Sequence, residues 1–376
     1  MVRILAALGI GLLLAAIARP CSLCQNPVNR ATIGEEFDLA SFVVYGELSN
    51  PRLDPTGAGV GTTDLKIEKV MKGELGQLKT LTISRYVPIA DAKKPPKYLV
   101  FLEKSRDRFD ALVGIAIKSP ALLEFVEGSR PHRATSRVAA LAYYGKFLSH
   151  ADEQIAIDAF FEFAKSSDAE VAQAGRLLDR GQLRKLIEQP KLDADRLSLF
   201  AFLLGSCGNS TDADVLAELT KSLDGDRRSA MDGVLAGYIQ LRPKQGWTRV
   251  QEICGDAKQS FVVRHAAWRT MRCLQNWRPG EYRAEILRGM ESLLRDGEFA
   301  DFALEDLARW QWWDLTPLVA QQFDQPTHKA PIIRNSIIRY AVRCPLPEAR
   351  ALLARARGID PEYVADQEKL LASGGR

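Results

Sequence analysis

The pattern of apolar and polar residues changes once along the chain. Between residues 41 and 117, short runs rich in β-branched and aromatic residues alternate apolar with polar positions, as half-buried strands do. A stretch rich in glycine and proline, residues 50–61, separates the first two runs. The pattern predicts five strands and a short closing helix at residues 41–48, 62–68, 78–84, 98–102, 108–117 and 120–126. Five short strands within about 90 residues favour a small closed barrel.

From residue 134 onward, apolar residues recur every 3.6 positions, which predicts helices. Five strongly apolar helices are expected at residues 197–207, 231–241, 262–277, 299–313 and 332–344. Their equivalent positions are 36, 33, 36 and 33 residues apart, if the equivalent residues are Phe202, Tyr238, Met271, Leu307 and Tyr340. Each interval holds one amphipathic helix, so the unit is a helical hairpin of about 35 residues. The region resembles HEAT-like repeats, which share one continuous core; an irregular helical bundle is the alternative.

Capping residues mark where several helices begin. Ser167 and Glu170 have the spacing of a capping box, and Thr211 with Asp214 comes close to one. Asp193 and Asp314 are placed to cap two further helices.

The N-terminal residues predict export. Arg3 precedes an apolar run from residue 4 to residue 18, which is shorter than the roughly 20 residues of a transmembrane helix. Ala16 and Ala18 are the small residues that a signal peptidase requires. We therefore expect residues 1–18 to be a cleaved signal peptide, and the mature chain to be secreted or periplasmic without stable membrane insertion. A retained N-terminal anchor is the alternative.

Three features of the strand-rich part carry a resemblance to a known family. They are cysteines near the expected mature start, the run FVVYGE at residues 42–47, and the segments 67–73 and 98–102. Residues 21–128 resemble the netrin-like domain, an OB-type barrel shared with tissue inhibitors of metalloproteinases. The resemblance implies an OB-like barrel, and it implies inhibition of an extracellular metalloprotease through an N-terminal cysteine. In this sequence Arg19 and Pro20 precede Cys21, and the strand-rich part contains no cysteine.

Export also affects how the six cysteines are interpreted, because disulfides persist outside the cytoplasm. Cys21 and Cys24 form a C-x-x-C pair, and the other four lie far downstream at Cys207, Cys254, Cys273 and Cys344. No second C-x-x-C is present for a zinc ribbon, and no histidine follows Cys24 for haem attachment. A structural disulfide between Cys21 and Cys24 and a reduced pair both remain open, as does pairing with the downstream cysteines.

The net charge and the absence of known motifs argue against several classes of function. The 51 basic and 47 acidic residues leave a net charge of +4, which does not favour binding to nucleic acid. The four histidines form no metal-binding spacing, and the sequence has no G-x-S-x-G or Walker A motif. We therefore expect no catalytic residue, no cofactor and no metal site.

Arginine recurs on successive apolar helices of the repeat region, together with a tryptophan-rich helix end, RWQWWD at residues 309–314. In stacked hairpins these side chains would share one concave surface and bind an acidic or aromatic peptide. The predicted partner-binding residues are Arg269, Arg272, Arg309, Trp313, Arg339 and Arg343. The alternative is that the arginines are solvated or bonded to carbonyl groups at helix ends.

The sequence thus predicts an α+β multidomain protein. Residues 1–18 are a signal peptide, residues 19–128 a small OB-like β-barrel, and residues 129–376 an α-helical repeat domain, an α-solenoid of HEAT-like type. We expect an exported, non-catalytic protein that acts as an interaction or scaffold protein for an unidentified protein partner. A metalloprotease inhibitor is the first alternative, and a hydrolase without a known motif is the second.

Overall fold

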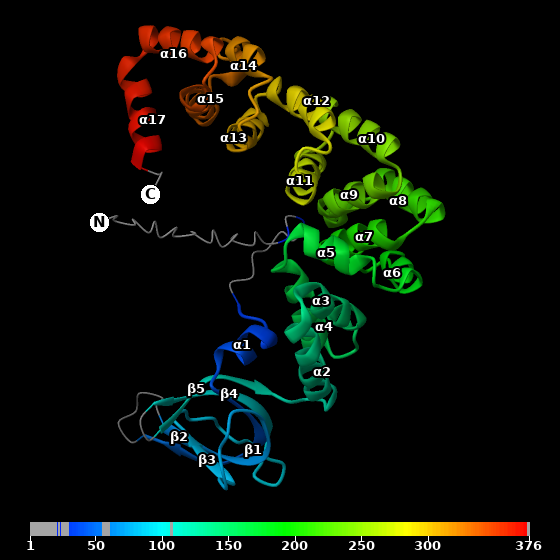
Figure 1. Cartoon of the computed structure of the whole chain (residues 1–376), viewed down its shortest axis with the longest axis vertical. Helices are drawn as coiled ribbons and strands as arrows, with labels where there is room; N and C mark the ends of the chain where they lie inside the picture. The colour runs from blue at the N-terminus through cyan, green and yellow to red at the C-terminus, as the bar shows by residue number, and fades with distance from the viewer. Residues whose placement is uncertain (1–20, 22, 24–29, 55–60, 106–107, 374–376) are drawn as a thin grey trace, which may run out of the picture.

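A computed structural model describes residues 21, 23, 30–54, 61–105 and 108–373 (Figure 1). The expected signal peptide and Cys24 lie outside these residues. A small β-barrel lies at one end of the molecule, and a curved array of helices extends from it (Figure 1). The predicted fold class, an OB-like barrel followed by a helical solenoid, is confirmed.

Five strands of the described chain close the barrel in the order β1-β2-β3-β5-β4. Only the contact between β3 and β5 is parallel among these neighbours, and the others are antiparallel. The strands are β1 (Phe42–Leu53), β2 (Gly61–Lys72), β3 (Thr80–Ile83), β4 (Lys97–Ser105) and β5 (Arg108–Ala116).

Successive side chains of β1 and β4 point alternately to two faces, and both faces are buried. Val44 and Val100 point into the barrel core, whereas Val43, Leu99 and Phe101 belong to the large core shared with the helices. Because β4 is buried on both faces, its sequence is a continuous apolar run instead of an alternating one. The barrel therefore packs on the array through the outer surface of β1 and β4.

The predicted end of β1 at residue 48 is wrong. The strand continues to Leu53 through an irregularity between Ser49 and Arg52. Asn50 takes a left-handed φ of 46° there, a conformation that asparagine tolerates better than most residues. Arg52 then pairs with Asp64 of β2 at 2.5 Å, so a stretch that has turn composition is part of the sheet.

Two helices connect the barrel to the array. The sequence pattern did not predict α1 (Ile33–Leu39). The helix predicted at residues 120–126 is longer, since α2 spans Ala121–Thr135. The α2 helix therefore runs across the expected domain boundary at residues 128 and 129. Pro131 lies within it, and Thr135 Oγ1 donates to the Pro131 carbonyl over 2.9 Å.

The array continues as helical hairpins. Its first part consists of α3 (Arg137–Tyr144), α4 (Glu153–Ala164), α5 (Asp168–Gly175), α6 (Arg180–Ile187), α7 (Ala194–Cys207), α8 (Ser210–Ser222) and α9 (Met231–Leu241). Its second part consists of α10 (Pro243–Gly255), α11 (Phe261–Trp277), α12 (Arg283–Leu294), α13 (Ala300–Trp310), α14 (Thr316–Gln322), α15 (Pro331–Arg343), α16 (Pro347–Ile359) and α17 (Pro361–Ser373).

The predicted apolar helices α7, α9, α11, α13 and α15 form the inner layer of the array, and α10, α12, α14 and α16 lie outside it (Figure 1). Within the inner layer α7 contacts α9, α9 contacts α11, and α13 contacts α15. Val234, Leu235 and Leu307 are completely buried in this layer. The repeat spacing therefore predicted which helices supply the shared core.

Glycines bring α7 and α9 close together. A Cβ atom on Gly237 would lie 2.2 Å from the carbonyl oxygen of Ala201, and one on Gly233 would lie 2.0 Å from that of Ser198. Such distances are far below a van der Waals contact. These positions therefore require glycine for the backbones of the two helices to approach.

The capping predictions are confirmed at two positions. Ser167 and Glu170 form the capping box of α5, and Asp193 caps α7. The box of α8 is instead formed by Asn209 and Asp212. The prediction for Asp314 is wrong, because α14 begins after Leu315 and Asp314 pairs with Arg283 at 2.5 Å.

The α1 helix ties the barrel to the array by polar contacts. Ile33 N–H donates to Asp158 Oδ1 of α4 over 2.9 Å. Arg133 of α2 pairs with Asp38, and Lys165 pairs with Glu35. A short helix at the junction is thus held from both neighbouring helices.

Candidate partner-binding cleft

A concave cleft of about 870 Å³ lies between the last inner helices, α13, α15 and α17. We call it the C-terminal cleft. It is lined by Leu304, Glu305, Ala308, Arg309, Gln311, Trp313, Ser336, Arg339, Tyr340, Arg343, Pro345, Leu370 and Leu371. Figure 1 shows α13 and α15 on the inner side of the array and α17 at its C-terminal end. The volume falls within the range of sites that bind small molecules or short segments.

Four of the six predicted partner-binding residues line this cleft: Arg309, Trp313, Arg339 and Arg343. Arg309 comes from the end of α13, whereas Arg339 and Arg343 lie one helical turn apart on α15. Residues four positions apart share one face of a helix. The contact between α13 and α15 then brings all three arginines to one concavity.

The three arginines differ in how they are held. Arg309 Nη1 donates to Asp306 Oδ1 over 3.1 Å. Arg339 lies 3.8 Å from Glu305 and donates to Ser336 Oγ over 3.2 Å. Arg343 is exposed and pairs with no carboxylate in the described part of the chain. With Glu305 as the one acidic residue among those that line the cleft, the cleft carries net positive charge.

An aromatic wall stands beside the arginines. Trp313 packs edge-on against Tyr340, with ring centroids 5.1 Å apart and an interplanar angle of 72°. The Tyr340 hydroxyl is 2.8 Å from Thr316 Oγ1, and burial raises the pKa of Tyr340 above its usual range. Because the ring of Tyr340 is fixed inside the core, it holds Trp313 at the edge of the cleft.

The end of α13 decides which tryptophan faces the cleft. Gln311 takes a left-handed φ of 58° and ends the helix, so the expected continuation to residue 313 is wrong. Beyond this turn Trp312 is buried, and the Arg283 guanidinium stacks over it at 4.4 Å. Trp313 remains half-buried at the cleft.

Arg269 and Arg272 do not line the C-terminal cleft. Arg269 Nη2 lies 2.9 Å from Asp232 Oδ2, and only 11% of its side chain is exposed. Asp232 is fully buried and also accepts from Ser198 Oγ over 2.8 Å. Burial raises the pKa of Asp232 to about 6, although Arg269 opposes this. Arg269 therefore joins α11 to α9.

Arg272 has a similar role one repeat later. Its Nε lies 3.4 Å from Asp306 of α13, and its guanidinium stacks over Trp268 at 4.7 Å. Asp306 thus lies between Arg272 and Arg309 and is 1% exposed. Burial raises the pKa of Asp306 to about 6, and the two arginines oppose the shift.

These pairs form a ladder along the inner layer. Arg269 and Asp232 join α11 to α9, Arg272 and Asp306 join α11 to α13, and Arg339 approaches Glu305 between α15 and α13. The period of about 35 residues places an arginine of one inner helix against a carboxylate of its neighbour. The arginines were predicted from the sequence but these carboxylates were not, although Asp306 lies three residues before Arg309.

The sequence pattern also did not predict that side chains of α17 line the cleft. Leu370 and Leu371 line the cleft from this helix, and Leu370 is 59% exposed. An exposed leucine that faces arginines and Trp313 provides an apolar wall for a ligand. The C-terminal cleft can therefore hold a segment that carries carboxylates on one side and apolar groups on the other.

Cys21 lies away from the cleft. Its side chain is 3% exposed, and its N–H donates to the Ala164 carbonyl over 3.1 Å. The predicted pairing of Cys21 with Cys24 involves a residue outside the described part of the chain and stays a prediction.

The described residues contain no group of three or more histidine, cysteine, aspartate or glutamate residues that could hold a metal ion. None of their helices is both long enough and apolar enough to span a membrane.

No known protein family matches the chain, and no curated protein matches it in sequence.

Proposed function

We propose that this is an exported, non-catalytic protein that binds a segment of a partner protein in the C-terminal cleft. The observation that carries the proposal is the convergence on one cleft of Arg309, Arg339 and Arg343, from two inner helices, and of Trp313, from the turn after α13. Arginine and tryptophan are the side chains that most often dominate binding energy at protein interfaces. The near-balanced charge of the whole chain favours a protein partner over nucleic acid.

The charges of the cleft indicate which kind of ligand it binds. Arg343 has no carboxylate partner among the described residues, and the side chains of Arg309 and Arg339 are 42% and 33% exposed. Arginine binds carboxylates through paired N–H donors. Trp313, Leu370 and Leu371 supply the apolar contacts. We therefore propose an acidic segment with aromatic or aliphatic residues as the ligand.

The proposal extends to location and domain type. Residues 1–18 have the sequence of a signal peptide, which supports a secreted or periplasmic protein. The OB-like strand order and the run at residues 42–47 support a netrin-like domain at residues 19–128. Residues 129–376 form the proposed HEAT-like domain. Metalloprotease inhibition has less support, since it requires an accessible N-terminal cysteine and Cys21 is 3% exposed.

The test measures binding of fluorescent acidic peptides, with and without tryptophan or leucine, to the purified chain by anisotropy. The double variant R339A/R343A should bind at least about tenfold more weakly, because it loses two charged contacts. The matched control is R288A/R295A, which removes two arginines, each 57% exposed, from the outer helix α12. Equal losses in both variants, or no binding of any acidic peptide to the wild type, would overturn the proposal.

A further inference from the structure

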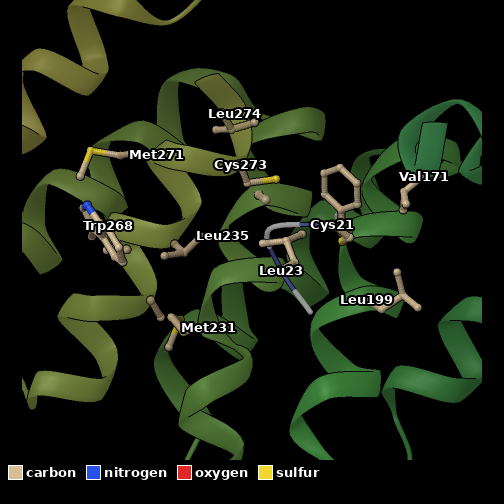
Figure 2. Close-up of a cluster of buried hydrophobic side chains, with 14 of the residues drawn as sticks. Cys21, Leu23, Val171, Leu199, Met231, Leu235, Trp268, Met271, Cys273 and Leu274 are labelled. Atoms are coloured by element: carbon tan, nitrogen blue, oxygen red, sulfur yellow. The ribbon is translucent and has the colours of Figure 1, made fainter. Parts of the chain in front are cut away.

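The inner layer of the array also contacts a segment of the chain itself. Cys21 and Leu23 are 3% and 0% exposed, although they are the first described residues. Figure 2 shows both side chains among buried residues of the inner helices. Cys21 also donates its N–H to the carbonyl of Ala164 at the end of α4. A segment from the start of the chain is thus part of the core of the array.

Four inner helices surround this segment. Val171 of α5, Leu199 of α7, Leu235 of α9 and Leu274 of α11 lie around it in Figure 2, and each is completely buried. We call these four residues the segment-binding surface. They belong to the same apolar cluster as Cys21 and Leu23. The surface is apolar, so it requires a ligand of different chemistry from that of the C-terminal cleft.

The array curves tightly at this surface. Helix α5 contacts α11, although α7 and α9 come between them in the inner layer. Phe202 of α7 packs edge-on against Trp277 of α11, with centroids 5.5 Å apart. Inner helices two and three steps apart therefore meet here, and they surround a segment instead of presenting a flat face.

We propose that the segment-binding surface is a peptide-binding site, separate from the C-terminal cleft, and that the chain fills it with its own Cys21 and Leu23. The site takes a short apolar segment with a small side chain, an aliphatic side chain two positions later, and a main-chain N–H for the Ala164 carbonyl. The inference does not depend on the proposed function, because the C-terminal cleft lies on other helices.

Attachment keeps the site occupied. Helix α1 follows Leu23 in the sequence, and it is fixed to α4 by the bond from Ile33 N–H to Asp158 and to the residue after α4 by the pair of Lys165 with Glu35. A tethered ligand has an effective concentration that a free peptide matches only at millimolar levels. The intact chain should therefore exclude added peptide, and displacement of its own segment should open the site.

The test uses the full chain with Leu23→Asp and a fluorescent peptide of residues 19–30 under reducing conditions. The L23D chain should bind the peptide at least about tenfold more tightly than the wild type does, since a buried aspartate displaces the tethered segment. A peptide that carries the same substitution should bind at least about tenfold more weakly than the native peptide. The matched control is L39D, at a leucine that is 71% exposed, and it should behave as the wild type.

A folded L23D chain that fails to bind the peptide, or a wild type that binds it equally well, overturns the proposal. If L23D does not fold, hydrogen exchange on L23A replaces the binding measurement. Amide exchange in α5 and α11 should then be at least about tenfold faster, with α13 and α15 unchanged. Exchange that is unchanged in α5 and α11 also overturns it. Binding of acidic peptides by L23D tests the C-terminal cleft separately.

Discussion

Arg309 donates from Nη1 to Oδ1 of Asp306 over 3.1 Å, so an arginine of the C-terminal cleft is held by a carboxylate that is only 1% exposed. The same carboxylate faces Arg272 of the neighbouring inner helix. The charge state of Asp306 therefore affects how strongly Arg309 is committed to its own chain. This pair connects the ladder of the inner layer with the proposed binding site.

The first prediction concerns the pH dependence of binding in the cleft. Burial raises the pKa of Asp306 to about 6, so a fall in pH from 7 to 5 protonates it and weakens its hold on Arg309. The carboxylates of a bound peptide remain ionised in this range. We expect affinity for an acidic peptide to rise about threefold to tenfold between pH 7 and pH 5.

Asp306→Asn is the matched test of this mechanism. The amide oxygen of asparagine still accepts a bond from Arg309 but carries no charge. The variant should bind the peptide at pH 7 as the wild type does at pH 5, and its affinity should not change between these pH values. If a histidine of the array caused the pH dependence instead, the affinity of D306N would still change between pH 7 and pH 5. Peptide titrations at both pH values distinguish the two.

The second prediction concerns stability and the junction residue Asp158. Burial raises the pKa of Asp158 to about 7, while the bond from Ile33 N–H opposes the shift. Its Oδ2 has no hydrogen-bond partner among the described residues. Between about pH 4 and pH 7 the folded state binds more protons here than the unfolded state, so the free energy of unfolding falls as pH rises.

Asp158→Asn should remove this dependence. Asparagine keeps an oxygen for Ile33 N–H and is neutral at every pH. We expect D158N to be more stable than the wild type by ~2–4 kcal/mol at pH 8 and equally stable below pH 4. Urea unfolding at both pH values measures the difference. The other acidic side chains are the same in both proteins and affect their stabilities alike. A gain in the free energy of unfolding of D158N that is equal at pH 4 and pH 8 would therefore contradict the explanation.

The third prediction concerns Glu162, which is completely buried. Its carboxylate lies 3.3 Å from Arg133 and 2.5 Å from Arg137. Glu162→Ala leaves both guanidinium groups without this partner, and their side chains are only 15% and 28% exposed. We expect a loss of about 2–4 kcal/mol in the free energy of unfolding, discounted for this partial exposure.

The matched control is Glu291→Ala on α12. Glu291 and Arg295 also form a close pair, at 2.8 Å, but they are 44% and 57% exposed. Solvent screens such a pair, so its loss should change the free energy of unfolding by less than about 1 kcal/mol. Similar losses for the two variants in urea unfolding would show that burial is not what makes Glu162 important.

The repeat spacing predicted the inner helices because apolar periodicity is a local property of the sequence. It could not distinguish Arg269 from Arg309, since both are arginines on successive inner helices. Arg269 is 11% exposed against Asp232, whereas Arg309 is 42% exposed at the cleft. The exposure of each arginine depends on how neighbouring helices pack around it, and these contacts join residues far apart in sequence, as Arg269 and Asp232 are.

The burial of Cys21 and Leu23 is a second feature that the local sequence could not predict. The C-x-x-C of Cys21 and Cys24 suggested a structural disulfide or a reduced pair, and nothing near Leu23 marks it as a core residue. Its burial depends on Leu199, Leu235 and Leu274, which follow at least 176 positions later. Local pattern determines which side chains are apolar, and the tertiary fold determines which of them meet.

The last prediction concerns the glycine contacts between α7 and α9. Gly237→Ala would place a Cβ 2.2 Å from the Ala201 carbonyl oxygen. The helix backbones must move apart, and we expect a loss of about 2–3 kcal/mol in the free energy of unfolding. Gly358→Ala on α16 is the matched control, because its Cβ would meet no atom within 4 Å. There alanine should stabilise the helix by about 0.5 kcal/mol. Urea unfolding that shows the same change for both variants would contradict the close approach of α7 and α9.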